Sequence, residues 1–313
     1  MQRDAPWGLA RTAHRLIGFG SYEQFHHAPS GGEGVTVHVL DTGIKVDHVD
    51  FEGRARWGAT IRVGDESRYL SGYGRSIAPA PTVGVIAGSR YGVSKNASVV
   101  AVKVLRSDGS GIMSDVLKGI DFVTSEHHLA SAVAKVRGEK FRGSVANLSL
   151  VVPPSRALDH AVNAVSRAAA SSCDAGNMAG PSNYSDAVTS RLCFIRGRES
   201  KQPVAAGIHF AVAAGNDGGK ACDNSPAAAE LAATVAASTI ADERASFSNH
   251  GSCVDIIAPG KDIPSEWTDY IPNPADLKDI LLRRATEGVV EGLPIETPNR
   301  LLYIGPLEPL IYD

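Results

Sequence analysis

Cysteine, aromatic residues and long apolar runs are all scarce in this chain. Four cysteines among 313 residues are too few for a disulfide scaffold, and they do not have the spacing of metal ligands. No apolar run reaches the roughly 18 residues that a membrane-spanning helix needs. The first ten residues also lack the apolar core of a signal peptide. We therefore expect neither a membrane partner nor an export signal.

A large excess of charge of either sign is also missing. The formal net charge of −3 argues against nucleic acid or an anionic membrane as the main partner. Hydrophobic residues make up 43% of the chain and charged residues 21%, which is ordinary for a globular protein with a sizeable core. The length allows one large α/β domain or two smaller ones.

What the sequence does contain is an alternation of short apolar strands with helices. Four segments have strand-like patterns, at 35–40, 99–105, 146–150 and 210–214. Apolar residues at helical spacing follow Ser114 and Ser155, each of which can cap a helix. This alternation, with continuously apolar strands, predicts an α/β fold with a parallel sheet covered by helices.

The strand at 35–40 runs directly into Asp41-Thr42-Gly43. Catalytic groups gather at the carboxyl edge of open α/β sheets, so Asp41 is a candidate active-site carboxylate. An isolated Asp-Thr-Gly is explained equally well as a turn. Asn216 also follows a strand, although Gly215-Asn216 suits a sharp loop regardless of any chemistry.

One long segment does not fit the alternation. Between Ser166 and Val204 the chain is polar and patternless, and it contains Cys173 and Cys193. Structureless connections of this length are uncommon inside compact domains. The segment is a disordered insertion, a functional loop or translated intron sequence, and we predict that it lies outside the core.

Several motifs, taken in order along the chain, resemble the subtilases, a family of serine proteases. They are Asp41-Thr42-Gly43, DHVDFEGRA at 47–55, AVKVL at 101–105, FAVAAGND at 210–217, SPAA at 225–228, FSN at 247–249 and IAPG at 257–260. The pattern is most similar to the proteinase K branch and, within it, to cerevisin-like vacuolar serine proteases. The resemblance implies one subtilase-like domain over 1–313, with a subtilisin-like doubly wound parallel sheet flanked by helices and a truncated C-terminal part.

The resemblance also implies peptide-bond hydrolysis by an Asp–His–Ser triad. In such a triad the serine attacks, an imidazole takes its proton, and a carboxylate orients the imidazole. Asp41 matches the carboxylate, and Asn216 matches the amide that stabilises the oxyanion. Gly109-Ser110-Gly111 resembles one wall of the substrate cleft.

The histidine and serine of the triad have no counterparts. Ala78 occupies the histidine position, and no histidine lies between His48 and His127. The serine motif falls in a deletion near 270–274, and no serine follows Ser265. We therefore expect a serine endopeptidase by family that is catalytically inactive, with Asp41 as a relic of the triad.

The glycines that line the family's specificity pocket are replaced by Val151 and Val152. A peptide or protein substrate is thus a partner only where a cleft survives, and the oligomeric state is left open. Two other interpretations also stay open: a non-catalytic pseudo-protease that binds peptides or inhibits, and a mis-spliced or decayed gene product. The family is vacuolar or secreted, but this chain shows neither signal peptide nor propeptide, so its localisation is left open.

The resemblance further implies a disulfide between Cys222 and Cys253, a pair that occurs in some proteinase K relatives. The alternative for these two cysteines is a pair of buried free thiols. Asp255 resembles a calcium-ligating aspartate of the same branch, which makes calcium a candidate metal. We expect no other cofactor.

Overall fold

The computed structural model of this chain describes residues 1–16, 23–61, 81–106, 108–167, 206–262, 281–282 and 285–304, with backbone alone at 81 and 82. Three features discussed above lie outside these residues. They are Ala78, the predicted deletion near 270–274, and the predicted insertion at 166–204 beyond its first two positions.

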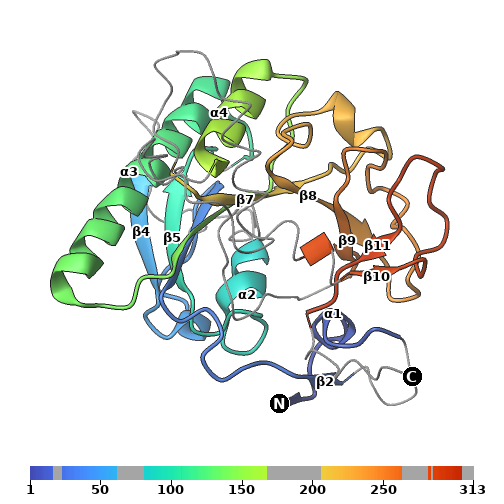
Figure 1. Ribbon diagram of the computed structural model, residues 1–313, viewed down its shortest axis with the longest axis horizontal. Coiled ribbons are helices and arrows are strands. Elements are labelled where there is room, and N and C mark those ends of the chain that lie inside the picture. Colours follow the sequence, from blue (N-terminus) through green and yellow to red (C-terminus); the bar gives the residue numbers. More distant parts are fainter. Residues whose placement is uncertain are drawn as a thin grey trace, which may run out of the picture.

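The described residues form one nine-stranded sheet in the order β10-β11-β9-β8-β7-β6-β3-β5-β4 (Figure 1). The strands are β3 (Val35–Asp41), β4 (Ala55–Thr60), β5 (Ser98–Lys103), β6 (Gly143–Leu148), β7 (His209–Ala213), β8 (Ala233–Ser238), β9 (Ile256–Pro259), β10 (Thr286–Glu287) and β11 (Arg300–Leu301). Neighbouring strands are parallel, except β10 and β11. A separate antiparallel pair joins β1 (Gln2–Arg3) to β2 (Gln24–Phe25).

The order of the strands reverses at β3. From this strand the chain first builds β4 and β5 on one side, and then crosses over to build β6, β7, β8 and β9 on the other side. Ligand sites of doubly wound sheets lie where the order reverses, at the carboxyl ends of the strands. The four segments predicted as strands correspond to β3, β5, β6 and β7, which are adjacent in the sheet, so the predicted α/β fold is confirmed.

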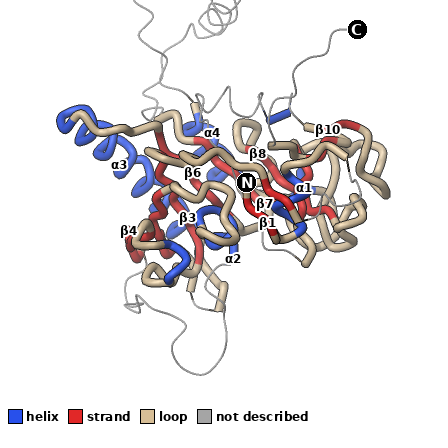
Figure 2. The backbone as a smooth tube through the Cα atoms, turned by 90° about the horizontal axis from the view of Figure 1, so that it is seen from below, coloured by secondary structure: helices blue, strands red, loops and turns tan. Residues whose placement is uncertain are grey.

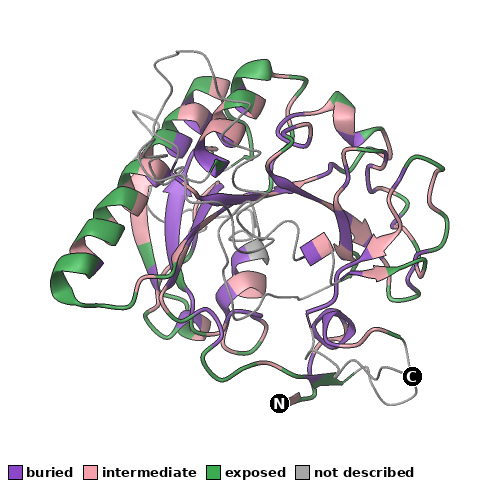
Figure 3. Ribbon diagram, in the orientation of Figure 1, coloured by how far each residue is buried: buried purple, intermediate pink, exposed green. Residues whose placement is uncertain are grey.

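Helices cover both faces of the sheet (Figure 2). They are α1 (Trp7–Thr12), α2 (Pro81–Ala87), α3 (Met113–Arg137) and α4 (Arg156–Ser166), with short 3₁₀ turns η1 (Val49–Phe51) and η2 (Ala221–Asp223). Side chains of α3 and α4 share one buried cluster with Leu40, whereas α2 shares another with Val37 and Val39. Alternate residues of β3 face opposite sides of the sheet, and helices cover both sides. The strand is therefore buried on both faces (Figure 3). No helix in the described part of the chain is long and apolar enough to span a membrane.

The two longest helices, α3 and α4, differ in how their ends are capped. Ser155 caps α4 as predicted, because its side chain accepts a hydrogen bond from the Leu158 N–H at 3.3 Å. The prediction that Ser114 caps α3 is wrong: this helix begins at Met113, and Ile112 precedes it without a side-chain cap. At the other end Gly138 has a φ of 67°, which glycine adopts without strain.

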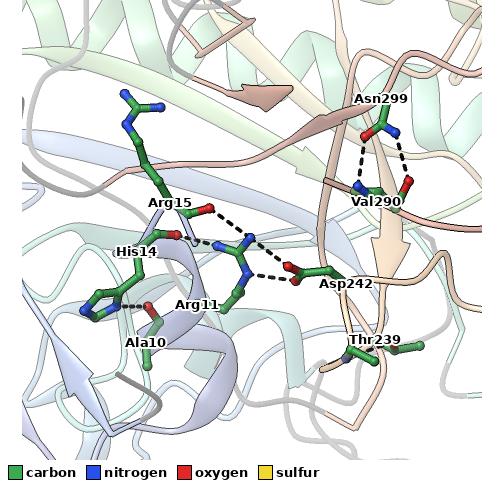
Figure 4. A network of polar contacts seen from close by, with 9 residues as sticks. Ala10, Arg11, His14, Arg15, Thr239, Asp242, Val290 and Asn299 are labelled. Atoms are coloured by element: carbon green, nitrogen blue, oxygen red, sulfur yellow. Dashed lines mark hydrogen bonds and ion pairs between the residues drawn. The ribbon is translucent and has the colours of Figure 1, made fainter. Parts of the chain in front are cut away.

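A buried ion pair fastens the amino-terminal helix α1 to the loop between β8 and β9, 231 residues away in the chain (Figure 4). Arg11 donates from Nε and Nη2 to the two carboxylate oxygens of Asp242, at 2.8 and 3.0 Å. Its remaining donors bond the carbonyls of His14 and Arg15. The two ionic side chains are only 2% and 11% exposed, so each charge depends on the other for compensation.

We expect Arg11→Met to destabilise the protein by about 3–5 kcal/mol, because it leaves the Asp242 carboxylate buried without its cation. The free energy of unfolding, measured in urea, tests this. The double variant Arg11→Met/Asp242→Asn should recover much of the loss, since it removes both charges. Lys45→Ala, which breaks the exposed Lys45–Asp47 pair, is the matched control and should change stability by less than about 1 kcal/mol. If Arg11→Met and Lys45→Ala lowered the free energy of unfolding equally, the prediction would be contradicted.

Candidate functional site

Asp41 is the last residue of β3 and is paired in register with Lys103 at the end of β5. Its Oδ1 atom accepts a hydrogen bond from the Thr42 N–H at 2.6 Å. Lys103 is 1% exposed, and its Nζ donates to the carbonyls of Thr42 and Leu105, both at 2.9 Å. The strand end therefore holds a carboxylate and a lysine that are bonded mainly to local backbone.

Burial raises the pKa of the Asp41 carboxyl above its ordinary value, and hydrogen bonds from Thr42 and the charge of Lys103 partly oppose that rise. Lys103 is thus the cation that acts on this carboxylate among the described residues. His48, the histidine that follows it in sequence, is exposed and caps η1, where its Nδ1 accepts from the Asp50 N–H at 3.2 Å. His48 is therefore a surface turn residue rather than a base held by Asp41.

Asn216 follows β7 on a tightly built loop and is exposed. The preceding Gly215 has a φ of 112°, and a Cβ atom there would lie 2.3 Å from Nδ2 of the fully buried Asn249. The Oδ1 atom of Asn249 accepts from the N–H groups of Asp217 and Gly219 at 3.1 and 3.0 Å. Asn249 therefore shapes the loop that presents Asn216.

The predicted cleft wall at Gly109-Ser110-Gly111 follows β5 and is an exposed turn with internal hydrogen bonds. The Arg106 N–H donates to the Ser110 carbonyl at 2.7 Å, and Asp108 Oδ1 accepts from the Ser110 N–H at 2.9 Å and from its hydroxyl at 2.6 Å. These bonds lower the pKa of the Asp108 carboxyl. Gly109 has a φ of 81°, the left-handed conformation that glycine permits.

The valines that replace the pocket glycines are held differently from each other. Val152 exchanges two backbone hydrogen bonds with Ser225, at 2.9 and 3.0 Å, so its N–H and C=O are already used. The Ser225 hydroxyl accepts from the Ser155 N–H at 2.8 Å and donates to Asp159 at 2.9 Å, which locks this contact in place. Val151 is 38% exposed and adds an apolar side chain at the same edge.

The structure thus brings three predicted site elements to the carboxyl edge of the sheet: Asp41 at the end of β3, Asn216 after β7 and the 109–111 turn after β5. Ala78 lies outside the described residues. Asp255 precedes β9 instead, and its Oδ2 accepts from the Thr234 N–H at 2.8 Å. Among described residues there is no group of three or more His, Cys, Asp or Glu suited to a metal ion.

Cys222, in η2, and Cys253 form a disulfide, with Cα atoms 5.2 Å apart. This is the pairing that the family resemblance implies, and it excludes the alternative of two free thiols in this structure. The bond ties the loop that follows Asn216 to the segment that leads into β9. Cys173 and Cys193 lie outside the described residues.

Two residues that shape the site were not singled out from the sequence. Lys103 had a visible signal, since it is a charged residue inside the otherwise apolar run 99–105. Asn249 had none beyond its place in the FSN motif, because its partners at 215–219 are about 30 residues away in the chain.

Comparison with known proteins assigns the family. The subtilase family model matches residues 32–287, so the chain belongs to the subtilase family. It is 42% identical over 345 residues to the subtilisin-like serine protease Pen c 2 of Penicillium citrinum, covering 97% of this chain and 66% of that protein. It is 41% identical over 340 residues to the subtilisin-like serine protease pepC of Aspergillus niger, covering 95% and 55%. The chain thus spans between about half and two thirds of these relatives.

The fold comparison agrees with the sequence comparison. A cold-adapted subtilisin-like serine proteinase of known crystal structure superposes with a TM-score of 0.64 at 29% sequence identity. The match covers 96% of this chain and 98% of the other. The sheet described above is therefore the subtilisin-like sheet that the motifs predicted.

We expect Asp41→Asn to stabilise the protein at pH 7. Because the folded-state pKa of Asp41 is raised, its contribution to stability is fully present below the ordinary value of 3.8 and is lost as pH rises through the folded-state value. The gain should therefore vanish in acid, and urea unfolding between pH 3 and 7 measures it.

Asp47→Asn is the matched control, because Lys45 lowers the pKa of the exposed Asp47 and gives the opposite sign. That variant should lose a little stability at pH 7, or none. A loss of stability in Asp41→Asn at neutral pH would contradict the prediction. It would mean that the charged carboxylate stabilises the folded protein more than its contact with Lys103 explains.

Replacing both Cys222 and Cys253 with serine is expected to lower the free energy of unfolding by about 3–4 kcal/mol, since the bond closes a loop with a sequence separation of 31 residues. A reductant should bring the unsubstituted protein to the level of the variant and leave the variant unchanged. Equal stability of the two proteins without reductant would mean that the bond does not form.

Proposed function

We propose that this chain is a member of the subtilase family that does not hydrolyse peptides. The observation that carries the proposal is the surroundings of Asp41: in the described part of the chain, the groups that act on its carboxylate are Thr42 and Lys103, not an imidazole. The sequence supports it, because Ala78 stands at the histidine position and no serine follows Ser265.

The chemistry of acyl transfer explains why these substitutions matter. A serine hydroxyl attacks the peptide carbonyl only as its proton passes to a base, which later returns a proton to the leaving amine. This chain offers neither group at the matching positions. Asn216 retains a side-chain amide that can donate to an oxyanion, but such a donor stabilises an intermediate that has to form first.

Known magnitudes indicate how much activity is lost. In subtilisin, itself a member of this family, loss of the serine or the histidine alone is measured to lower kcat by about 10⁶. The remaining 10³–10⁴-fold acceleration over water, roughly, comes from substrate binding and the oxyanion hole. Here Val151 and Val152 stand where the family has its pocket glycines, so we expect substrate binding to be weaker as well.

We expect purified protein of this sequence to show no cleavage of a chromogenic Ala-Ala-Pro-Phe peptide and no labelling by a serine-directed phosphonate. An active subtilase in the same assay is the positive control. Any turnover that Asp41→Asn or Asn216→Leu reduces would be intrinsic to the chain and would overturn the proposal. Uptake of one equivalent of the phosphonate would do so as well.

A non-catalytic peptide-binding role is the second candidate, and the hydrogen-bonded 109–111 turn favours it. This wall keeps its hydrogen bonds between Asp108 and Ser110 although the triad is incomplete. Calorimetric titration with the same peptide tests the role, with Asp108→Ala as the variant that loosens the wall. Binding that this variant weakens supports a surviving cleft. No binding to either protein removes the second candidate and leaves the first unaffected.

A further inference from the structure

A histidine in the central strand β3 is buried without a hydrogen bond. His38 is 1% exposed, and neither ring nitrogen has a hydrogen-bond partner in the described part of the chain. Its side chain lies on the α3 face of the sheet, two residues before Leu40, where Val100 and Ala146 are its register partners. A buried polar group of this kind is costly, and a buried charge is more so.

The charged groups that act on His38 come from two elements, β4 and α3. Arg56 of β4 forms an ion pair with Glu126 of α3, and their side chains are 56% and 21% exposed. His127 of α3 is the third group, and its Nδ1 is also buried without a partner. The strands on either side, β5 and β6, contribute apolar side chains, and β6 also contributes the Val145 carbonyl, which favours the protonated ring only weakly.

Burial is the main reason that the neutral form of His38 is favoured. It lowers the pKa from 6.5 to about 4, and the positive charges of Arg56 and His127 act in the same direction. Glu126 opposes them, but that carboxylate already holds Arg56. Burial lowers the pKa of His127 as well.

The part of α3 that begins at His127 is weakly held to the rest of the molecule. The side chains that α3 contributes to the main core cluster, Val116, Ile120 and Val123, all lie in its first half. Beyond them Ala134 is the one buried residue, whereas Leu129 and Val136 are 59% and 87% exposed. Figure 3 shows this end of α3 extending past the sheet as an exposed helix. A segment with few buried apolar contacts opens at low free-energy cost.

We propose that His38 makes the contact between the second half of α3 and the sheet acid-sensitive, so that protonation of the buried imidazole releases this half of the helix. In the closed arrangement the acceptor that acts on the ring among the described residues is the Val145 carbonyl, and its effect is the smallest of those on His38. In the open arrangement water reaches the ring and solvates its charge. This device is independent of the proposed loss of catalysis, because it depends on no residue of the candidate site.

The direction of the pH dependence follows from how strongly the closed and open states bind a proton at His38. Above pH 6.5 the ring is neutral in both, and the closed state keeps its full stability. As pH falls below 6.5 the open state takes up a proton that the closed state binds only near pH 4. Between pH 7 and 4.5 the open population should therefore rise by about 60-fold.

Hydrogen exchange read by mass spectrometry on the full chain, corrected for intrinsic exchange rates, tests this between pH 7 and 4.5. We expect amides of 127–137 to lose protection about 60-fold in the unsubstituted protein and much less in His38→Phe. Glu126→Gln should enlarge the loss, since it removes the compensating carboxylate. His128→Gln, which replaces the adjacent exposed histidine, is the matched control and should behave like the unsubstituted protein.

The same loss of protection in His38→Phe as in the unsubstituted protein would overturn the proposal, and so would unchanged protection at pH 4.5. If His38→Phe fails to fold, the titration of the His38 ring followed by NMR in the unsubstituted protein decides the matter. A midpoint below about 5 supports the device, and one near the ordinary value of about 6.5 refutes it.

Discussion

The hydrogen bonding of β3 between β5 and β6 is the constraint on which the rest of this structure depends. The register places Asp41 beside Lys103 at one end of the strand. It also turns Val37 and Val39 toward α2 while His38 faces α3. A slip of one residue would exchange these faces, burying the polar ring among different neighbours and removing two valines from their cluster. The candidate site and the acid-sensitive contact are therefore both consequences of the same register.

Hydrophobic pattern locates the strands of this protein but not their ends. The run 99–105 is apolar throughout except for Lys103, so pattern alone extends the strand to Leu105. In the structure β5 stops at Lys103, because the N–H groups of Val104 and Leu105 both bond the carbonyl of Asp41. Such endings are decided by which backbone acceptor is within reach, and that depends on a partner strand about 60 residues away in the chain. Sequence pattern carries no record of it.

The start of α3 shows the same limit at short range. Ser114 is a good capping residue by type, yet it lies inside the first turn of the helix, where Met113 is the first helical residue. The cap at Ser155 was predictable because its partner, Leu158, is three residues away and the intervening turn is regular. Local chemistry is thus legible from sequence when both partners are close and the backbone between them follows one pattern.

For the candidate site, the sequence identified two residues at the edge of the sheet but not the neighbouring side chains that shape their surroundings. Asp41 and Asn216 were found because each ends a strand and matches a family motif. The roles of Lys103 and Asn249 depend on contacts between segments that only the fold brings together. The disulfide was predictable for a different reason, since it belongs to the family's pattern and both cysteines lie in well-matched segments.

The surroundings of Asp41 also explain why a carboxylate can persist here without an imidazole. Burial disfavours its charged form, but the Thr42 N–H and the cation of Lys103 offset part of that cost. Lys103 in turn satisfies its ammonium on the carbonyls of Thr42 and Leu105. The polar groups at this strand end therefore compensate one another within a few residues. These contacts lower the cost of an aspartate at this position without cancelling it. Its presence is therefore compatible with the fold and is not in itself an argument for catalysis.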